Sequence, residues 1–274
     1  MTSSEAEAEQ LVEDLGLTLP IIPEEVCAHI SEDELLVEYR EEKFQSLDIC
    51  GLSVGQGNKV IVIVNSDITN NGRRNFTGAH EVGHVVLHIQ TSIKSEFNCS
   101  DKDLYGKNDA NSVYEKEANE FASSLLMPKS LIGKRITSTD LSWDLIHKLS
   151  LDCATSLEAT ARRVVTLSRE QCALVIHKKG QMWTPIRSTS FNGYVGITPF
   201  PDYLEESLDE TNATYPSELE ECDASDWFTN PKGIPDLIQY QSIYNKKYDR
   251  RMTLLVIPEV DIDDNDEWES PCFR

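Results

Sequence analysis

The spacing of hydrophobic positions predicts two short helices and a small sheet at the start of the chain. Apolar residues recur at helical spacing over residues 6–17, and a second short helix is predicted to end near Ile30. After Ile30 the apolar residues recur every second position, which is the spacing of β-strands. Candidate strands lie at residues 36–39, 46–54 and 59–64. The last of these is a valine and isoleucine run, which is typical of a central strand.

Two longer helices are predicted in the next part of the chain. The first runs from about residue 75 to 90. The second runs from about residue 112 to 127 and ends before Pro128, because the residue before a proline avoids the helical conformation. Residues 91–111 between them are polar and predict a mobile loop. Two or three further helices are expected within residues 138–168.

The last hundred residues have the pattern of strands interrupted by acidic segments. Apolar runs at residues 173–176 and 181–186 flank a hairpin turn, and residues 252–257 form another clear strand. Residues 201–230 hold ten acidic residues and no lysine or arginine. We therefore predict that this stretch is a solvent-exposed loop or partly disordered.

The composition indicates a soluble cytoplasmic protein. The 274 residues contain no apolar run long enough for a transmembrane helix, and the acidic first residues lack the features of a secretory signal. The seven cysteines form no C-x-x-C pair, and their odd number argues against a disulfide framework. We therefore expect thiols in a reducing compartment and no membrane partner.

The net charge of −22 disfavours general nucleic-acid binding. A chain this acidic is repelled by phosphate backbones, whereas it could attract a basic protein. A solubilising surface explains the same charge without any partner. A DNA-binding role for the helices of residues 138–168 is a weak alternative, because Arg162 and Arg163 are their only adjacent basic pair.

The residues His80-Glu81-Val82-Gly83-His84 carry the clearest chemical signal. Two histidines four positions apart lie about 40° apart around a helix, so both imidazoles can bind one Zn²⁺. Glu81 then stands beside the metal, where it can take a proton from water. On a helical wheel the histidines and Glu81 occupy one face and the valines and Ile89 another, as an amphipathic buried helix requires.

A catalytic zinc needs a third protein ligand and one open position. The spacing of metzincins is excluded, because Leu87 and Gln90 stand where a glycine and a histidine would be required. His88 is a poor candidate, since it lies two turns from His80 and about 12 Å along the axis. We interpret His88 as a structural or cleft-wall histidine.

The second long helix offers a better ligand. Glu115 falls on its apolar face, where an inward carboxylate is costly unless it is paired or bound to metal. Glu117 falls on the outer face and is predicted to be solvated. Asn119 lies one turn after Glu115 and could fix the tautomer of a ligand histidine. The alternative for Glu115 is an anion that only stabilises the start of the helix.

These two helices resemble the signatures of the ImmA/IrrE family of metallo-endopeptidases. Residues 73–88 are similar to R-x-R-F-T-x-A-H-E-x-G-H-x-x-L-H, and residues 115–128 to E-x-E-A-N-x-F-A-x-x-L-L-M-P. Asn75 and Gly78 depart from the first signature without touching a catalytic position. The resemblance covers roughly residues 6–168 and implies the ligands His80, His84 and Glu115, the catalytic residue Glu81, and Zn²⁺, with another divalent metal such as Mn²⁺ conceivable in the cell.

The predicted fold is α+β with three regions. Residues 1–135 would form a zincin-like peptidase core, in which a small mixed sheet packs on the H-E-x-x-H helix and on the glutamate-bearing helix. Residues 136–170 would add a helical segment, and residues 171–274 an acidic α+β region that could be regulatory. Within the core, the strand of residues 59–64 could pair with an extended substrate.

The resemblance implies cleavage of a helix-turn-helix repressor, which would derepress a mobile-element, toxin–antitoxin or stress-response operon. Tyr105 and His147 are the two candidates for stabilising the oxyanion, and the sequence does not choose between them. The alternative function is a non-proteolytic, metal-binding regulator that sequesters a repressor. Glu81 favours the enzyme, because binding alone needs no general base.

Overall fold

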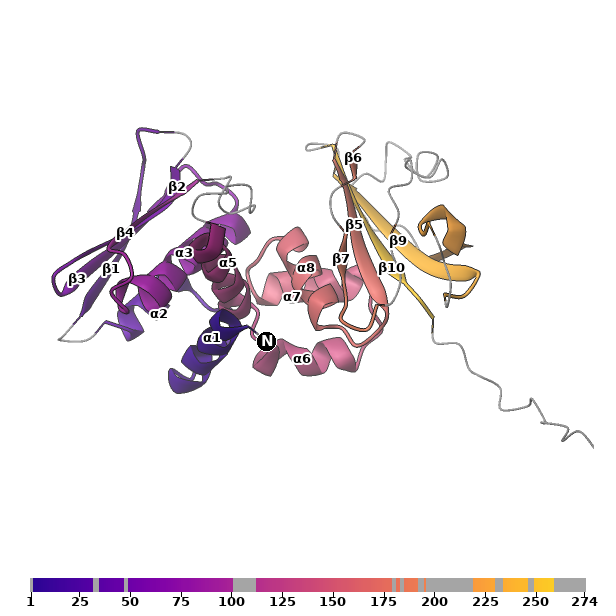
Figure 1. Cartoon of the computed structure of the whole chain (residues 1–274), viewed down its shortest axis with the longest axis horizontal. Helices are drawn as coiled ribbons and strands as arrows, with labels where there is room; N and C mark the ends of the chain where they lie inside the picture. The colour runs from indigo at the N-terminus through magenta and orange to yellow at the C-terminus, as the bar shows by residue number, and fades with distance from the viewer. Residues whose placement is uncertain are drawn as a thin grey trace, which may run out of the picture. The chain divides into compact units, whose positions relative to one another are not determined.

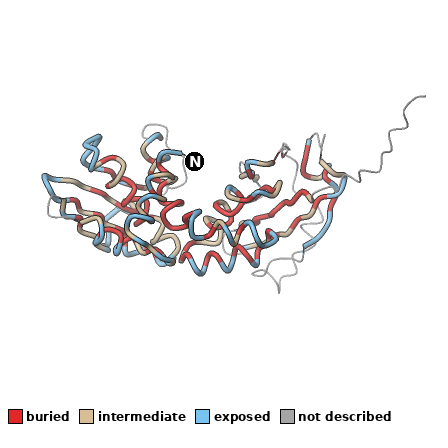
Figure 2. Tube along the Cα trace, turned by 90° about the horizontal axis from the view of Figure 1, so that it is seen from below, coloured by how far each residue is buried: buried red, intermediate tan, exposed pale blue. Residues whose placement is uncertain are grey.

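The computed structural model folds into two compact units, Met1–Ser168 and Arg169–Arg274 (Figure 1). Buried stretches run through helices and strands alike in both units (Figure 2). No helix in the described part of the chain is long and apolar enough to cross a membrane. The structure describes residues 2–31, 35–46, 49–100, 112–178, 181–182, 185–191, 195, 219–229, 234–245 and 249–258.

The first unit contains a four-stranded mixed sheet. Its spatial order is β1-β3-β2-β4, with β1 parallel to β3 and the other pairs antiparallel. The strands are β1 (Leu36–Glu42), β2 (Ile49–Gln56), β3 (Lys59–Asn65) and β4 (Glu96–Ser100). Because β3 is paired along both edges, the prediction that a substrate could add to residues 59–64 is wrong.

Strand β4 lies within the segment predicted to be a loop. Its residues alternate between exposed Glu96 and Asn98 and buried Phe97 and Cys99, which is the period of a half-buried strand. Only two apolar side chains carry this signal inside a polar segment, so the sequence pattern was too short to predict the strand. Residues 101–111, the remainder of the predicted loop, lie outside the described residues.

Helices pack against this sheet, and α3 occupies the central position. It contacts β2 and β3 on one side and α5 on the other (Figure 1). The helices of the unit are α1 (Ser3–Asp14), α2 (Pro23–His29), α3 (Asn71–His84), α5 (Ser112–Leu126), α6 (Lys129–Thr137), α7 (Trp143–Asp152) and α8 (Leu157–Leu167). The helices expected within residues 138–168 therefore belong to this unit rather than to a separate body.

Helix α3 begins earlier than predicted and changes its winding after the metal-binding motif. The side chain of Asn70 accepts a hydrogen bond from the backbone N–H of Arg73, which starts the helix at Asn71. After His84 the chain forms one wider π-helical turn, η1 (Val85–Ile89). Such turns occur mostly as local insertions in α-helices, often at functional sites.

A glycine allows α3 and α5 to approach closely. A Cβ atom on Gly83 would lie 3.1 Å from Cδ1 of Phe121 and 3.2 Å from Cα of Ala118. Both neighbours are fully buried between the helices. This close packing places the first turn of α5, which carries Glu115, against the histidines of α3.

A buried arginine joins three helices of the first unit. Arg163 on α8 is 5% exposed and donates to the Oε1 atom of Glu5 on α1 at 2.7 Å. It also donates to the carbonyl of Met127, directly after α5, at 3.2 Å. Because its charge is paired and its donors are used, this arginine can be buried at little cost.

The second unit is built on an antiparallel sheet of order β6-β5-β10-β9-β8, with the short β7 also paired to β5. The predicted strands at residues 173–176 and 252–257 are its centre. A further strand, β9, was not predicted. The strands are β5 (Cys172–Lys178), β6 (Gln181–Met182), β7 (Ile186–Arg187), β8 (Glu220–Asp223), β9 (Leu237–Asn245) and β10 (Arg250–Val256).

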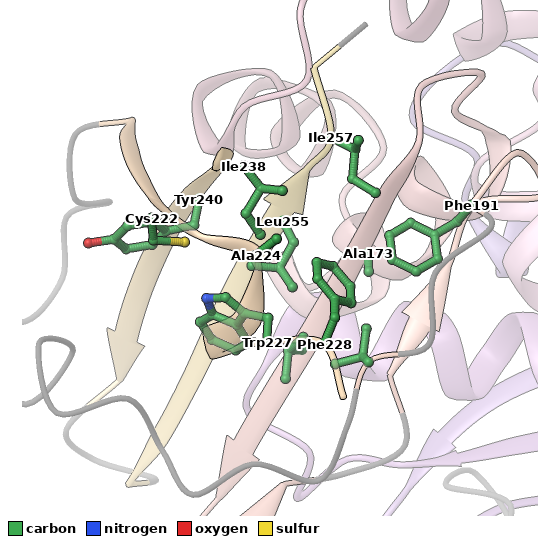
Figure 3. Close-up of a cluster of buried hydrophobic side chains, with 12 residues drawn as sticks. Ala173, Phe191, Cys222, Ala224, Trp227, Phe228, Ile238, Tyr240, Leu255 and Ile257 are labelled. Carbon is green, nitrogen blue, oxygen red and sulfur yellow. The ribbon is translucent and has the colours of Figure 1, made fainter. Parts of the chain in front are cut away.

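Aromatic side chains form the core of this unit (Figure 3). Trp227 and Phe228 are 1% and 2% exposed and follow the short helix η2 (Ala224–Asp226). Residues 201–230 were predicted to be a solvent-exposed loop or partly disordered, and this is wrong for residues 220–228, which form β8 and η2 and bury Cys222, Ala224, Trp227 and Phe228. In β8 the acidic residues are exposed and only Cys222 is buried, so a single apolar position carried the signal for this strand.

Candidate metal centre

Three ligand-type side chains converge where α3 crosses α5. The Nε2 atoms of His80 and His84 lie 3.0 Å apart. The Oε2 atom of Glu115 lies 3.1 Å from Nε2 of His80 and 3.4 Å from Nε2 of His84. Both histidines are fully buried, and Glu115 is 5% exposed. The structure thus brings together the three residues predicted as ligands.

The geometry of these atoms fits a divalent metal. In a four-coordinate zinc site with bonds near 2.0–2.1 Å, neighbouring ligand atoms lie about 3.3 Å apart. The observed triangle has sides of 3.0–3.4 Å. Two imidazoles and a carboxylate are also a common ligand set for divalent first-row metals, so the residues fit the group that the sequence predicted.

The surroundings of Glu115 and His84 keep each side chain in the protonation state that can bind a metal. Burial raises the pKa of Glu115, but the hydrogen bonds to His80 and His84 outweigh it and hold the pKa at about 2. Burial lowers the pKa of His84 to about 3. At neutral pH Glu115 is therefore ionised and His84 is neutral, and these are the forms that ligate metal ions.

Each ligand histidine has a partner on its second ring nitrogen. Nδ1 of His80 lies 3.0 Å from Oδ1 of Asn119, as the sequence suggested. Nδ1 of His84 lies 3.1 Å from Nδ1 of His88. With a metal bound at Nε2, Nδ1 of each histidine would carry the proton and donate it to these partners. Both rings would thereby be fixed in one tautomer and one orientation.

His88 extends this arrangement to the surface. Its Nε2 atom lies 3.0 Å from Oε2 of Glu117, whose side chain is 37% exposed. Glu117 was predicted to be solvated on the outer face of its helix, whereas the structure places it on His88. Strand β4 adds Phe97, whose ring stacks on His84 with centroids 4.1 Å apart. Neither contact could be derived from the separate helical patterns.

Glu81 is held against strand β2. It is fully buried, and Ser53 donates hydrogen bonds to its Oε2 atom and to its backbone carbonyl. A Cβ atom at Gly51 would lie 2.3 Å from Oε1 of Glu81, so only glycine leaves room for this carboxylate. Sequence reasoning missed Gly51 and Ser53. A glycine inside a strand pattern is the signal that could have drawn attention to the first.

A third group missed from the sequence is the thiol of Cys99 on β4. Ligand atoms of His80, Cys99 and Glu115 all lie within 4.8 Å of one another, and all three residues are buried. The two residues proposed for the oxyanion gain no support here. Tyr105 lies outside the described residues, and His147 is exposed on α7 whereas the centre is buried.

The site and fold match a known class of protein. The IrrE N-terminal-like domain of the M78 peptidases matches residues 33–172, about half of the chain. The chain belongs to this family of metallopeptidases, which implies a divalent metal and confirms the resemblance of the two helical signatures. The matched segment contains the helices α3 and α5 that form the centre.

A solved structure supports the fold beyond that segment. The chain is similar to a Mycobacterium tuberculosis transcriptional regulator with a TM-score of 0.57 and 14% sequence identity. The likeness covers 94% of this chain and 88% of the other. At this identity the likeness concerns the fold alone. No curated protein matches the chain.

Proposed function

We propose that this protein is a zinc-dependent endopeptidase with a zincin-like core. His80, His84 and Glu115 hold the metal, and Glu81 is the general base. The observation that carries this proposal is the triangle of ligand atoms with sides of 3.0–3.4 Å, buried beside Glu81. A site built only to hold a metal would need no carboxylate kept next to it by Ser53.

The chemistry divides between the metal and Glu81. When bound, the metal supplies Lewis acidity, which lowers the pKa of water and polarises a peptide carbonyl. The Glu81 carboxylate accepts the proton of the attacking water and passes it to the nitrogen of the departing amine. Ser53 positions Glu81 through its hydrogen bonds, and Gly51 leaves the space in which that carboxylate lies.

The substrate binds as an extended segment along β4. This strand lies at the edge of the described sheet, and its Phe97 is stacked on a ligand histidine. An added strand here would pass the metal position, whereas β3 is paired on both sides and could not accept one. Main-chain pairing explains how a peptide bond of a folded or partly folded protein is presented to Glu81.

The substrate class is a helix-turn-helix repressor in the cytoplasm. The family resemblance suggests it, and the net charge of −22 suits a basic DNA-binding protein. The description of the similar mycobacterial protein as a transcriptional regulator agrees with a role in gene regulation. Cleavage of the repressor would release an operon from repression.

The test is incubation of the zinc-loaded full chain with the repressor encoded beside its gene. We expect cleavage fragments with the wild type and a loss of about 10²–10⁴-fold with Glu81→Gln. Glu120→Gln, which changes a carboxyl on the surface of α5, is the matched control and should keep the wild-type rate.

Two results would overturn the proposal. Equal cleavage by wild type and Glu81→Gln would remove the general base from the mechanism. A repressor that stays intact in both samples but elutes together with the protein would support the alternative of a non-proteolytic regulator. Mass spectrometry of the fragments identifies the scissile bond and excludes a contaminating protease if the Glu81→Gln sample stays intact.

A further inference from the structure

Cys99 faces the metal centre from strand β4. Side chains alternate along the strand, so Cys99 lies on the same face as Phe97, whose ring stacks on His84. Cys99 is 1% exposed and lies opposite Gly51 in the ladder between β2 and β4. Gly51 is the residue against which Glu81 packs. The strand register therefore directs the thiol to the neighbourhood of both the ligands and the general base.

The distances are those of a ligand that needs a small shift to bind. The Sγ atom of Cys99 and ligand atoms of His80 and Glu115 lie within 4.8 Å of one another. On one tetrahedral zinc with Zn–S near 2.3 Å, a sulfur lies about 3.5 Å from its nitrogen and oxygen neighbours. For His80 and Glu115 the remaining difference is at most about 1.3 Å, which a change of side-chain torsion supplies.

A second buried cysteine shows what a purely structural thiol looks like in the same sheet. Cys50 on β2 packs with the apolar side chains of Val64 and Ile68, and its sulfur accepts a hydrogen bond from Nη2 of Arg73 at 3.4 Å. Cys99 instead has an imidazole nitrogen and a carboxylate oxygen within 4.8 Å of its sulfur. Its Sγ atom lies 3.7 Å from the carbonyl of Ser100, a weak interaction that would not prevent metal binding.

We propose that Cys99 is a fourth protein ligand, which closes the metal site of the resting protein. This inference rests on the proposed metal centre of His80, His84 and Glu115. Four protein ligands characterise structural zinc sites, whereas catalytic sites keep one position for water. With Cys99 bound, the protein holds its metal tightly and is latent. Withdrawal of Cys99 opens the position that hydrolysis requires.

The location of the thiol indicates how the site opens. Cys99 lies on the edge strand along which the substrate is proposed to pair. A shift of β4 by about 1 Å, or a torsional change at Cys99, separates the sulfur from the metal position. The same strand would then bind the substrate and control access of water, with His80, His84 and Glu115 unchanged as the permanent ligands.

Cobalt substitution tests the proposal without relying on activity. The full chain is loaded with Co²⁺, and its absorption spectrum is compared with those of Cys99→Ser and Cys50→Ser. We expect an intense near-ultraviolet band from thiolate-to-cobalt charge transfer in the wild type and in Cys50→Ser, and its loss in Cys99→Ser. Competition with a chelator should show an affinity at least roughly tenfold lower for Cys99→Ser.

The rate of substrate cleavage provides a second readout, and it should change in the opposite direction to zinc affinity. If the thiol blocks the open position, Cys99→Ser should cleave the substrate faster than the wild type at saturating zinc, although it binds zinc more weakly. A residue that only packs the core would give the reverse, with lower activity, unchanged affinity and no band. That combination overturns the proposal.

The failure of Cys99 as a ligand is distinguishable from the failure of the metal centre. One tightly bound Co²⁺ without the charge-transfer band contradicts the role of Cys99 alone. Absence of metal binding in the wild type, with no difference from His80→Ala, contradicts the centre itself. If Cys99→Ser does not fold, X-ray absorption at the zinc edge of the wild type decides: one sulfur neighbour near 2.3 Å supports the proposal, and a shell of nitrogen and oxygen alone overturns it.

Discussion

Helix α3 and strand β5 are both buried, yet they differ in what they bury. Over residues 77–84 every position of α3 is buried, including two histidines and a glutamate. Strand β5 is buried from Cys172 to His177, and His177 is the one titratable side chain in that buried stretch besides Cys172. The comparison shows that burial by itself does not make a site. In α3 the buried polar groups are met by partners from α5, β2 and β4, and the partners converge on one point.

The largest expected difference between the two units is their dependence on metal. Glu115→Ala removes one of the three convergent ligand atoms, and we expect it to lower zinc affinity by more than ~10³-fold. Glu117→Ala on the same helix removes a partner of His88 instead. It should lower zinc affinity by a factor on the order of ten. Isothermal titration with zinc measures both.

Removal of zinc should also weaken the backbone hydrogen bonds of the first unit and leave those of the second unit unchanged. Hydrogen exchange followed by mass spectrometry should show faster exchange in α3 and α5 after chelation, with β5 and β10 unchanged. Equal acceleration in both units would break the comparison, because it would mean that the metal supports the whole chain rather than the first unit.

Gly51→Ala is expected to lower the catalytic rate by an intermediate amount. The added Cβ would collide with Oε1 of Glu81, so the carboxylate must leave its place beside the metal position. Because a displacement of about 1 Å can cost on the order of 10²-fold, we expect such a fall in kcat. Zinc affinity should stay close to that of the wild type, since none of the proposed ligands moves directly.

Gly57→Ala provides the control for a glycine change in the same sheet. Gly57 lies in the turn after β2 at φ +63°, and an added Cβ meets nothing within 4 Å. This variant should lose some stability from backbone strain but keep kcat. A fall of kcat in Gly57→Ala equal to that in Gly51→Ala would show that loss of sheet stability, not displacement of Glu81, is responsible.

The smallest expected effect is on the pH dependence of stability, and it comes from the buried His177 of the second unit. Burial, and then the charge of Arg251 opposite in the ladder, lower the pKa of His177 from 6.5 to about 4. Between these values the unfolded chain takes up a proton that the folded chain does not. The stability contributed by neutral His177 is therefore complete above pH 6.5 and is lost as the pH falls towards 4.

Replacement of His177 by glutamine should remove this dependence. We expect the free energy of unfolding of the second unit, followed by urea titration from pH 7 to pH 4, to fall less in His177→Gln than in the wild type. Parallel curves for the two proteins would contradict the shifted pKa.

The sequence predicted the parts of the site that depend on one helix at a time. A four-residue spacing places His80 and His84 together on any helix, and the apolar face of α5 separates Glu115 from Glu117. Residues that reach the site from the sheet escaped prediction. Gly51 and Cys99 become neighbours only through the pairing of β2 with β4, which depends on register and not on local pattern.

The predicted secondary structure likewise succeeded where the local pattern was strong and failed where tertiary contacts decide. Strands with continuous apolar runs, such as β3 and β10, were predicted with nearly correct bounds. Strands β4 and β8 were hidden because their outward residues are polar or acidic and their buried residues are few. The π-helical turn after His84 was also beyond prediction, since it depends on how the helix end packs rather than on the spacing of its residues.

The hydrogen-bonded series from His84 through His88 to Glu117 has a consequence for how the protein senses its surroundings. The ring of His84, which has no exposed surface, is linked through His88 by contacts of 3.1 Å and 3.0 Å to a carboxylate that water reaches. Salt, a bound cation or a neighbouring protein that alters the charge at Glu117 would change the electron density that His84 offers to a metal in the proposed centre. The surface of α5 can thus adjust a buried centre while the centre itself stays dry.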